Sequence, residues 1–342
     1  MSPAIPELPG VLGADEVARS AGYLLAAQEA DGGIPWFPGG HLDVWDHVEC
    51  AMALTATGHT GAARRAYSWL ATAQYPDGSW PAKLRQSRVA VPLRETNHAA
   101  YPAVGLLHHL LITGDEAFAR EVWPTVRAGI GFAMGLRTER GEFLWARDPG
   151  GGPGDHALLT VCSSVHHGLR CAAELGARLG EEHPEWTAAA DRLAVLINER
   201  EDVFADRSRF SMDWYYPILG GAVRGQAARE RIKERWDAFV VPGLGIRCVS
   251  DQPWVTGAET SELVLALASM GEVDLGAELL GSISHLRDPD DGAYWTGYQF
   301  AEKVRWPVER STWTAAAVIL AADALSQTTP GARVFTDPPG CG

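Results

Sequence analysis

The chain has 342 residues, of which 46% are hydrophobic and 21% are charged, as in folded proteins with a sizeable core, so a disordered or fibrous chain is excluded. Its 29 Lys and Arg against 43 Asp and Glu give a net charge of −14, which excludes nucleic acid as a partner because phosphates would be repelled. The start of the chain lacks the basic and apolar segments of a secretory signal, and no apolar run approaches the about 20 residues of a membrane span. Five scattered cysteines without CxxC spacing favour a reducing compartment, so we expect a cytoplasmic protein with no membrane contact.

Apolar periodicity and helix-capping residues predict twelve helices and no set of alternating strands. The predicted helices are residues 14–29, 43–57, 59–74, 95–113, 115–136, 157–180, 183–200, 211–222, 226–239, 258–270, 272–286 and 310–326.

The connections between these helices alternate between short and long. Short ones are built on glycine, as at Gly58, Gly114 and Gly271, and long ones cover residues such as 75–94 and 287–309. Six helical hairpins joined in this way predict an all-α (α/α)6 toroid, whose long loops gather on one face. We expect a single catalytic domain over residues 1–342, with 327–342 as a loosely held tail.

A repeated phrase lies in three of the long loops. Residues 28–36 (QEADGGIPW) recur as 74–80 (QYPDGSW) and, more loosely, as 287–295 (RDPDDGAYW). The Asp-Gly pair predicts a tight turn after an outer helix. The phrase therefore indicates either a structural staple or part of a binding face.

Tryptophan is the unusual component of the sequence. Nine of the thirteen Trp lie in the long loops or in the first turn of the following helix. Flat aromatic faces with polar rims suit sugar rings, and they also suit cations and carbocations. The aromatic residues therefore predict a cleft without deciding its ligand.

Carboxylates gather on the same face, and some of them, such as Asp43, Asp213 and Glu259, fit the role of helix caps. Asp46 and Glu262 lie further into two inner helices, where an acid is costly unless it faces a wet cavity. Two carboxylates across a sugar cleft are sufficient for glycoside hydrolysis. We therefore predict Asp46 as the acid and Glu262 as the base, with the roles interchangeable and the stereochemical outcome open.

Further residues of the loop face are predicted to contact substrate. They are Trp36, Asp43, Trp45, Trp80, His98, Trp214, Tyr216, Trp254, Glu259, Trp295, Tyr298, Arg310 and Trp313. The Cys and His residues lack the spacing of a zinc site, so no metal or cofactor is expected. The predicted partner is an oligosaccharide or polysaccharide, and the sequence leaves the oligomeric state open.

Three alternative functions remain at this point. Residues 288–291 (DPDD) match the DxDD string of class II terpene cyclases, although they also form the third copy of the turn phrase. His47, His98 and His156 would serve an epimerase of the same fold, acting on a sugar. A carbohydrate-binding module would use the aromatic residues but has no need of buried carboxylates.

Several segments resemble known families. Residues 95–101 (ETNHAAY), 110–134, 141–148 (GEFLWARD) and 309–325 resemble (α/α)6 toroid glycoside hydrolases of the glucoamylase type. Residues 28–54 (QEADGGIPWFPGGHLDVWDHVECAMAL) resemble mycobacterial proteins labelled prenyltransferase-like, a group that includes the methylmannose polysaccharide hydrolases. The resemblance implies a cytosolic endo-α-1,4-mannosidase of an actinobacterium, acting on 3-O-methylmannose polysaccharide through a carboxylate pair that matches Asp46 and Glu262.

Overall fold

The computed structural model describes residues 5–150, 152 and 154–340. All twelve predicted helical segments are confirmed, with ends that differ by a few residues. Six of them form an inner set: α2 (Val44–Ala56), α4 (Thr96–Ala100) continued by α5 (Pro102–Thr113), α7 (Leu159–Leu179), α9 (Ser211–Leu219), α11 (Gly257–Ser269) and α13 (Thr312–Ser326). The break between α4 and α5 falls at Pro102, which has no N–H to donate to the helix.

The inner helices contact one another in a closed order. α2 packs on α5, α5 on α7, α7 on α9, α9 on α11, α11 on α13, and α13 again on α2. Because each lies between two neighbours, these helices are apolar on most faces; in α2, every residue from Val44 to Ala56 is buried.

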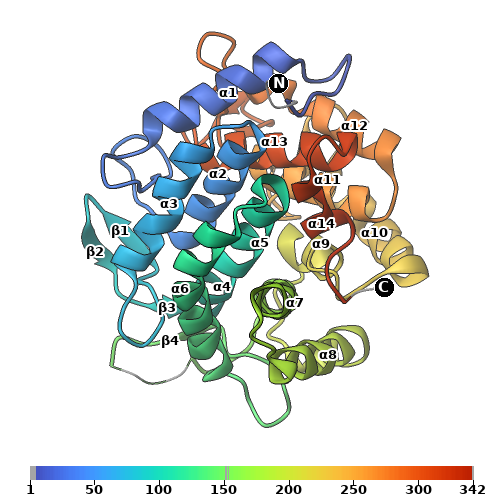
Figure 1. The fold of residues 1–342 in the computed structure, drawn as a ribbon. Helices are drawn as coiled ribbons and strands as arrows, with labels where there is room; N and C mark the ends of the chain where they lie inside the picture. The colour runs from blue at the N-terminus through green and yellow to red at the C-terminus, as the bar shows by residue number, and fades with distance from the viewer. Residues whose placement is uncertain (1–4, 151, 153, 341–342) are drawn as a thin grey trace.

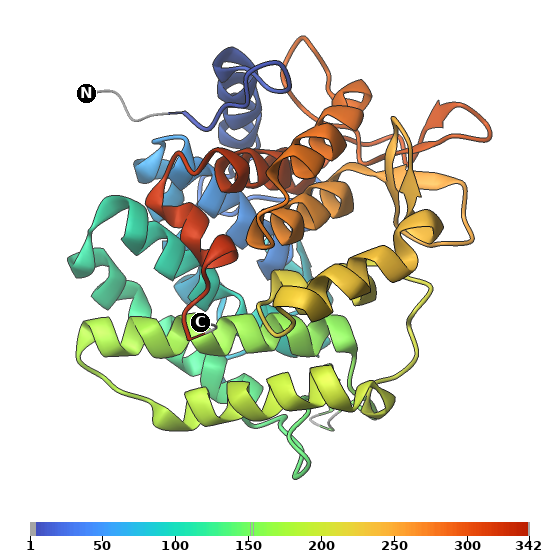
Figure 2. The same ribbon diagram turned by 90° about the vertical axis from the view of Figure 1, so that its right-hand side faces the viewer.

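The other six helices lie outside this set, as Figure 1 shows. They are α1 (Ala14–Ala27), α3 (Thr60–Ala73), α6 (Glu116–Met134), α8 (Pro184–Glu199), α10 (Gly225–Phe239) and α12 (Val273–Ser282). Each buries one stripe and exposes the rest, and each runs beside an inner helix, as α8 does beside α7 in Figure 2. No helix in the described part of the chain has the length and apolar content needed to cross a bilayer.

The long loops contain short strands that the sequence pattern did not predict. A hairpin pairs β1 (Lys83–Arg85) with β2 (Arg88–Val91), and β3 (Arg94–Glu95) pairs with β4 (Ala146–Arg147). A five-stranded antiparallel sheet has the order β5 (Val240–Val241), β6 (Gly245–Arg247), β7 (Trp254–Thr256), β8 (Gly297–Gln299) and β9 (Val304–Arg305). Strands of two to four residues are too short to show an alternating pattern.

The repeated Asp-Gly phrase joins consecutive outer helices. A Cβ on Gly32 would lie 2.3 Å from the carbonyl oxygen of Arg65 in α3, and one on Gly78 would lie 2.1 Å from that of Ala128 in α6. The side-chain amide of Gln74 donates to Gly78 and also to Thr125 of α6. The phrase is therefore a structural link between outer helices, in which only glycine permits the close approach of the turn to the backbone of the next helix.

The predicted loose tail is wrong for residues 327–340, which pack on the helices, while residues 341–342 lie outside the described part. A 3₁₀ turn (Pro330–Ala332) leads into α14 (Arg333–Thr336), and both Val334 and Phe335 are buried. The carbonyl of Val334 lies 2.7 Å from Nε2 of His167 in α7, and the Phe335 ring packs on the same imidazole. Apolar burial thus holds the end of the chain.

Candidate active site

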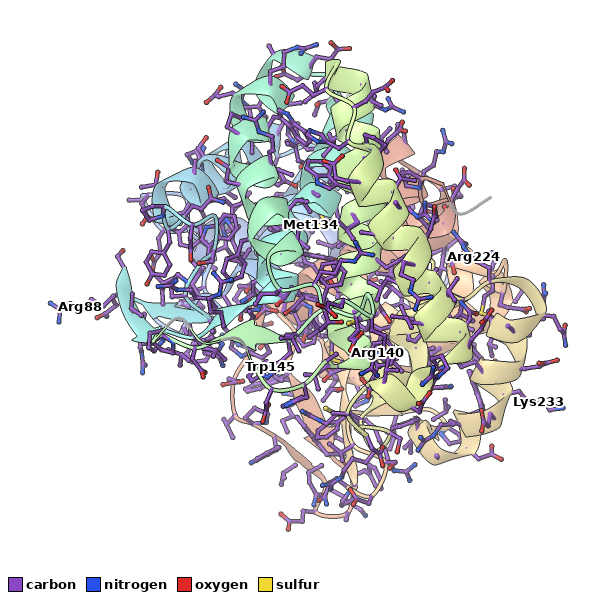
Figure 3. All side chains as sticks on the ribbon, turned by 90° about the horizontal axis from the view of Figure 1, so that it is seen from below. Arg88, Met134, Arg140, Trp145, Arg224 and Lys233 are labelled. Atoms are coloured by element: carbon purple, nitrogen blue, oxygen red, sulfur yellow. The ribbon has the colours of Figure 1, made fainter. Side chains whose placement is uncertain are left out.

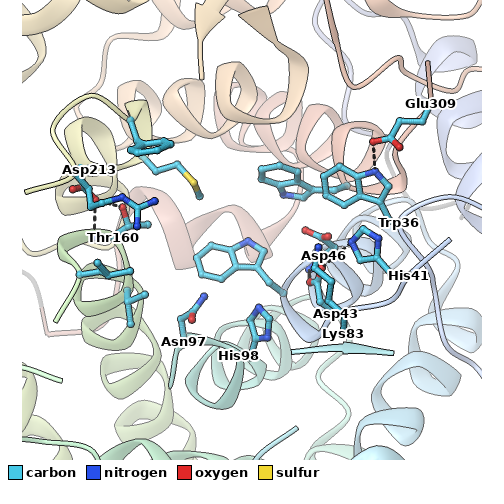
Figure 4. A pocket seen from close by; sticks show the side chains of 17 residues that line it. Trp36, His41, Asp43, Asp46, Lys83, Asn97, His98, Thr160, Asp213 and Glu309 are labelled. Carbon is cyan, nitrogen blue, oxygen red and sulfur yellow. Dashed lines mark hydrogen bonds and ion pairs between the residues drawn. The ribbon is translucent and has the colours of Figure 1, made fainter. Parts of the chain in front are cut away.

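The N-terminal ends of five inner helices, α2, α4, α7, α9 and α13, surround a cleft of about 530 Å³ (Figure 4). This volume is in the range of sites for small molecules and short oligomers. The lining combines aromatic and apolar side chains with charged and other polar ones: Trp36, His41, Asp43, Trp45, Asp46, Lys83, Asn97, His98, Leu158, Thr160, Val161, Arg207, Phe210, Met212, Asp213, Glu309 and Trp313.

The depth of a residue in this site follows from its position in its helix. The third residues of four inner helices line the cleft: Asp46 of α2, His98 of α4, Val161 of α7 and Asp213 of α9. The sixth residue lies about 4.5 Å deeper along the axis, because each residue rises 1.5 Å. Sixth residues, such as Glu49 in α2 and Glu262 in α11, therefore lie beneath the cleft.

Asp43 and Asp46 form a carboxyl pair on one wall of the cleft. Asp43 caps α2 by accepting the backbone N–H of Asp46 at 3.0 Å, and the two carboxyl groups also hydrogen-bond to each other. Burial, and then the charge of Asp43, raise the pKa of Asp46 well above its usual range. Burial alone would raise the pKa of Asp43, but neighbouring His98 and the hydrogen bonds from Asp46 outweigh it and lower that pKa. The pair therefore holds a proton on Asp46 and a charge on Asp43.

Two buried glutamates lie below the floor of the cleft. Glu49 accepts hydrogen bonds from the indoles of Trp45 and Trp313 and from the hydroxyl of Tyr101. Burial raises the pKa of Glu49 to about 7, although the hydrogen bonds from these three donors act to lower it.

Glu262 lies in the same layer and is fully buried. The hydroxyls of Tyr215 and Tyr216 each donate to its carboxylate at 2.5 Å. Burial, and then the charge of Glu49, raise its pKa well above the usual range. The prediction that Glu262 faces the cleft is wrong, because the two tyrosines and the floor of the cleft enclose it.

Glu259, the third residue of α11, lies one turn above Glu262 and is 7% exposed, compared with 0% for Glu262. Its carboxylate hydrogen-bonds with the thiol of Cys248. It shares the level of Asp46 and Asp213, although it is not among the residues that line the cavity.

Two further acids lie in the lining. Asp213 accepts the backbone N–H and the hydroxyl of Thr160, and so caps the start of α7. Glu309 accepts the indole N–H of Trp36 at 2.7 Å, and Trp36 packs on Trp313 with ring centroids 5.6 Å apart. In Figure 4, Asp213 and Thr160 lie across the cleft from Asp46 and His41.

Six of the predicted site residues come together in the cleft. They are Trp36, Asp43, Trp45, Asp46, His98 and Trp313. Trp45 stacks on Tyr101 at 4.5 Å and covers Glu49 beneath it, so its ring forms part of the floor.

Several predicted aromatic residues have structural positions instead. Trp80 is 1% exposed and donates to the carbonyl of Leu70, so it cannot contact a ligand. Tyr216 is buried against Glu262, and Trp214 donates to the carbonyl of Arg231 outside this cavity.

The remaining predicted residues lie on or near the five-stranded sheet, also outside the cavity lining. Trp254 donates to the carbonyl of Trp306, and Tyr298 packs edge-on against His285. The guanidinium of Arg310 lies 5.8 Å from the centre of the Trp295 ring.

Arg310 also pairs with Asp288 and Asp291 of the DPDD string. The side chain of Asp291 accepts the N–H of Ala293 within the turn. The DPDD string therefore has a structural role, in agreement with its place as the third copy of the Asp-Gly phrase.

Sequence reasoning missed several lining residues, among them His41, Lys83, Asn97, Phe210 and Met212. Asn97 lies beside His98 in the first turn of α4, and Met212 lies beside Asp213 in α9. Their position at the start of an inner helix could have identified Asn97 and Met212, since residues at these helix starts face the cleft whether or not they are charged.

One group in the described part of the chain has the spacing of a metal site. Ligand atoms of His41, Asp43 and Asp46 lie within 4.8 Å of one another. The hydrogen bond between the two carboxyl groups offers another explanation for their proximity.

No family model matches the chain. The chain is 52% identical over 332 residues to the MMP endo-(1,4)-3-O-methyl-alpha-D-mannosidase of Mycolicibacterium hassiacum, covering 97% of this chain and 92% of that protein. The chain belongs to the family of this mannosidase.

Solved structures with low identity share the fold of this family member. A glycosidase variant in complex with glucose has a TM-score of 0.72 at 15% identity, covering 92% of this chain and 99% of the other. A D-mannose isomerase has a TM-score of 0.68 at 12% identity, covering 92% and 97%. The cellobiose 2-epimerase of Spirochaeta thermophila has a TM-score of 0.66 at 10% identity, covering 92% and 96%. Hydrolases and isomerases therefore share this fold, so the fold alone does not decide the reaction.

Proposed function

We propose that this protein is a glycoside hydrolase that cleaves internal α-1,4 linkages of 3-O-methylmannose polysaccharide in the cytoplasm. The observation that carries the proposal is the 52% identity to an MMP endo-(1,4)-3-O-methyl-alpha-D-mannosidase over almost the whole chain. We also propose that the fold is an (α/α)6 toroid, which the closed order of inner-helix contacts supports.

The cleft fits a methylated sugar chain. Trp36, Trp45 and Trp313 offer ring faces, and Phe210 and Met212 add apolar surface. A 3-O-methyl group replaces a hydroxyl donor with apolar surface, which an aromatic wall accommodates without leaving a polar group unpaired.

Asp46 is the proposed general acid. Hydrolysis needs a proton on the oxygen of the leaving sugar, and a carboxyl with a raised pKa carries that proton near neutral pH. Asp46 lines the cleft and has the required shift, while the charge on Asp43 helps to keep Asp46 protonated.

The second carboxylate must accept a proton from the attacking water. Sequence analysis predicts Glu262 for this role, but Glu262 is sealed beneath the floor. We propose Glu259 instead: like Glu262 it is not among the residues that line the cavity, but it occupies the same helical level as Asp46 and is 7% exposed, compared with 0% for Glu262. The water's oxygen then bonds to the anomeric carbon as the bond to the leaving oxygen breaks, and Asp46 donates its proton to that oxygen.

Product analysis tests the function. The protein is incubated separately with 3-O-methylmannose polysaccharide, with free mannose and with prenyl diphosphates, and products are identified by mass spectrometry. We expect shorter methylated oligosaccharides with one new reducing end per cut. A new hexose isomer from mannose, or a hydrocarbon from the diphosphates, without polysaccharide cleavage would overturn the proposal.

A further inference from the structure

A second cavity of about 420 Å³ lies beside the cleft. Residues 201–208, the start of α9 and one side of α10 form its walls. Arg207 and Asp213 line both cavities, so the two hollows are neighbours separated by these side chains.

The second cavity is polar and holds charged groups with unused hydrogen-bonding capacity. Asp206, Arg207, Glu234 and Arg235 line it, and none of them forms an ion pair with another described residue. The guanidinium groups of Arg207 and Arg235 lie over the rings of Phe210 and Phe239, at 4.4 and 5.1 Å from the ring centres. Each guanidinium is thereby oriented while its N–H groups stay free to donate.

The two cavities differ in the chemistry that they favour. The cleft presents the indoles of Trp36, Trp45 and Trp313 beside four acids that already take part in hydrogen bonds within the protein. The second cavity presents five carboxylates and three guanidinium groups. Among these, Arg207, Glu234 and Arg235 form no ion pair with another described residue. Carboxylates accept from vicinal sugar hydroxyls and guanidinium groups donate to them. A methyl ether has no hydroxyl hydrogen to donate, so methylated units lose the contact with the carboxylates.

We propose that the second cavity is a subsite for sugar units with free 3-hydroxyl groups, reached by a chain that passes Arg207 from the cleft. This inference rests on the proposed function and adds to it. The enzyme would then bind the polysaccharide in one register, with methylated units in the cleft and unmethylated units in the second cavity.

Three synthetic α-1,4-linked mannose oligosaccharides of equal length test the subsite. One is 3-O-methylated throughout, and the other two are methylated only in the half nearer the reducing end or only in the other half. We expect the wild-type protein to cleave one half-methylated oligosaccharide faster than the fully methylated one. Glu234→Ala and Arg235→Ala should each lower that ratio of kcat/KM by about tenfold, the scale of one lost charged hydrogen bond, because the half-methylated oligosaccharide loses a contact that the fully methylated one lacks.

Matched controls come from the same helix. Glu230 and Lys233 lie on α10 outside the cavity lining, and Lys233 projects from the outer surface in Figure 3. Glu230→Ala and Lys233→Ala should keep the wild-type ratio. Equal wild-type rates on all three oligosaccharides, or an unchanged ratio in both cavity variants, would overturn the subsite. Failure of the wild-type protein to cleave any of them or the natural polysaccharide would instead overturn the proposed function.

Discussion

The backbone N–H of Asp46 donates to the carboxylate of Asp43 at 3.0 Å, so the N-cap residue of α2 also influences the pKa of the acid in the first turn of that helix. Capping holds Asp43 ionised, and its charge opposes ionisation of Asp46. The side chain that caps the helix therefore also keeps a neighbouring carboxyl protonated.

The first prediction concerns the pH dependence of hydrolysis. Asp46 acts as an acid only while protonated, so activity should fall as the pH rises through its raised pKa. Asp43→Asn retains a capping side chain but removes the charge, which lowers the pKa of Asp46 and moves the alkaline limb of the kcat profile to lower pH.

Asp15→Asn is the control for this experiment. Asp15 is exposed in the first turn of α1, away from the cleft, so its loss should leave the profile in place. An alkaline limb that does not move in Asp43→Asn would contradict the proposed coupling.

The second prediction separates the two glutamates of α11. Glu259→Gln should reduce kcat at least about a hundredfold with little change in thermal stability, since it removes the proposed base. Glu262→Gln should change kcat by less than about tenfold, because Gln preserves the volume and still accepts a hydrogen bond from Tyr215 or Tyr216. The opposite ranking would assign the base to Glu262.

The third prediction links stability to the carboxyl beneath the floor. The pKa of Glu49 is about 7 in the folded protein, above its value of about 4.3 in an unfolded chain. The contribution of Glu49 to the free energy of unfolding is therefore complete below the pKa that Glu49 has in the unfolded chain. This contribution, on the order of 3 kcal/mol, is lost as the pH rises through about 7.

Denaturation with urea between pH 5 and pH 8 measures this loss. Glu49→Gln is neutral at every pH and should therefore show a flatter dependence of stability on pH than the wild type. An identical slope in the two proteins would show that Glu49 does not carry the effect.

The sequence predicted the helical frame because the inner and outer helices carry an apolar pattern and several have a glycine or capping residue at one end. It failed at Trp80, whose burial depends on the contact between Gly78 and α6, which lies about 50 residues further along the chain. Such a contact has no local signal.

The position of Glu262 shows how a small boundary error changes a site. With predicted helix starts at 43 and 258, Asp46 and Glu262 fall at the fourth and fifth positions of their helices. The observed starts at Val44 and Gly257 move them to the third and sixth positions, which differ by almost one turn. Glu259, predicted as a cap and a substrate contact, takes the level that matches Asp46.

The fourth prediction concerns the C-terminal segment. Phe335 is 2% exposed and packs on His167, so Phe335→Ala should destabilise the protein by about 3–5 kcal/mol. Arg333→Ala is the matched control, since Arg333 is exposed and pairs with Asp337 one helical turn away, a contact worth little. Equal unfolding midpoints for the two variants would mean that the segment adds no stability.

The most direct test of the account compares the wild-type protein with Asp46→Asn on 3-O-methylmannose polysaccharide, with new reducing ends counted over time and product lengths determined by mass spectrometry. We expect the wild type to release fragments of intermediate length from the first minutes, and Asp46→Asn to release them at least about a hundredfold more slowly with the same thermal unfolding midpoint. Fragment release by Asp46→Asn at the wild-type rate would contradict the assignment of the acid on which the mechanism depends.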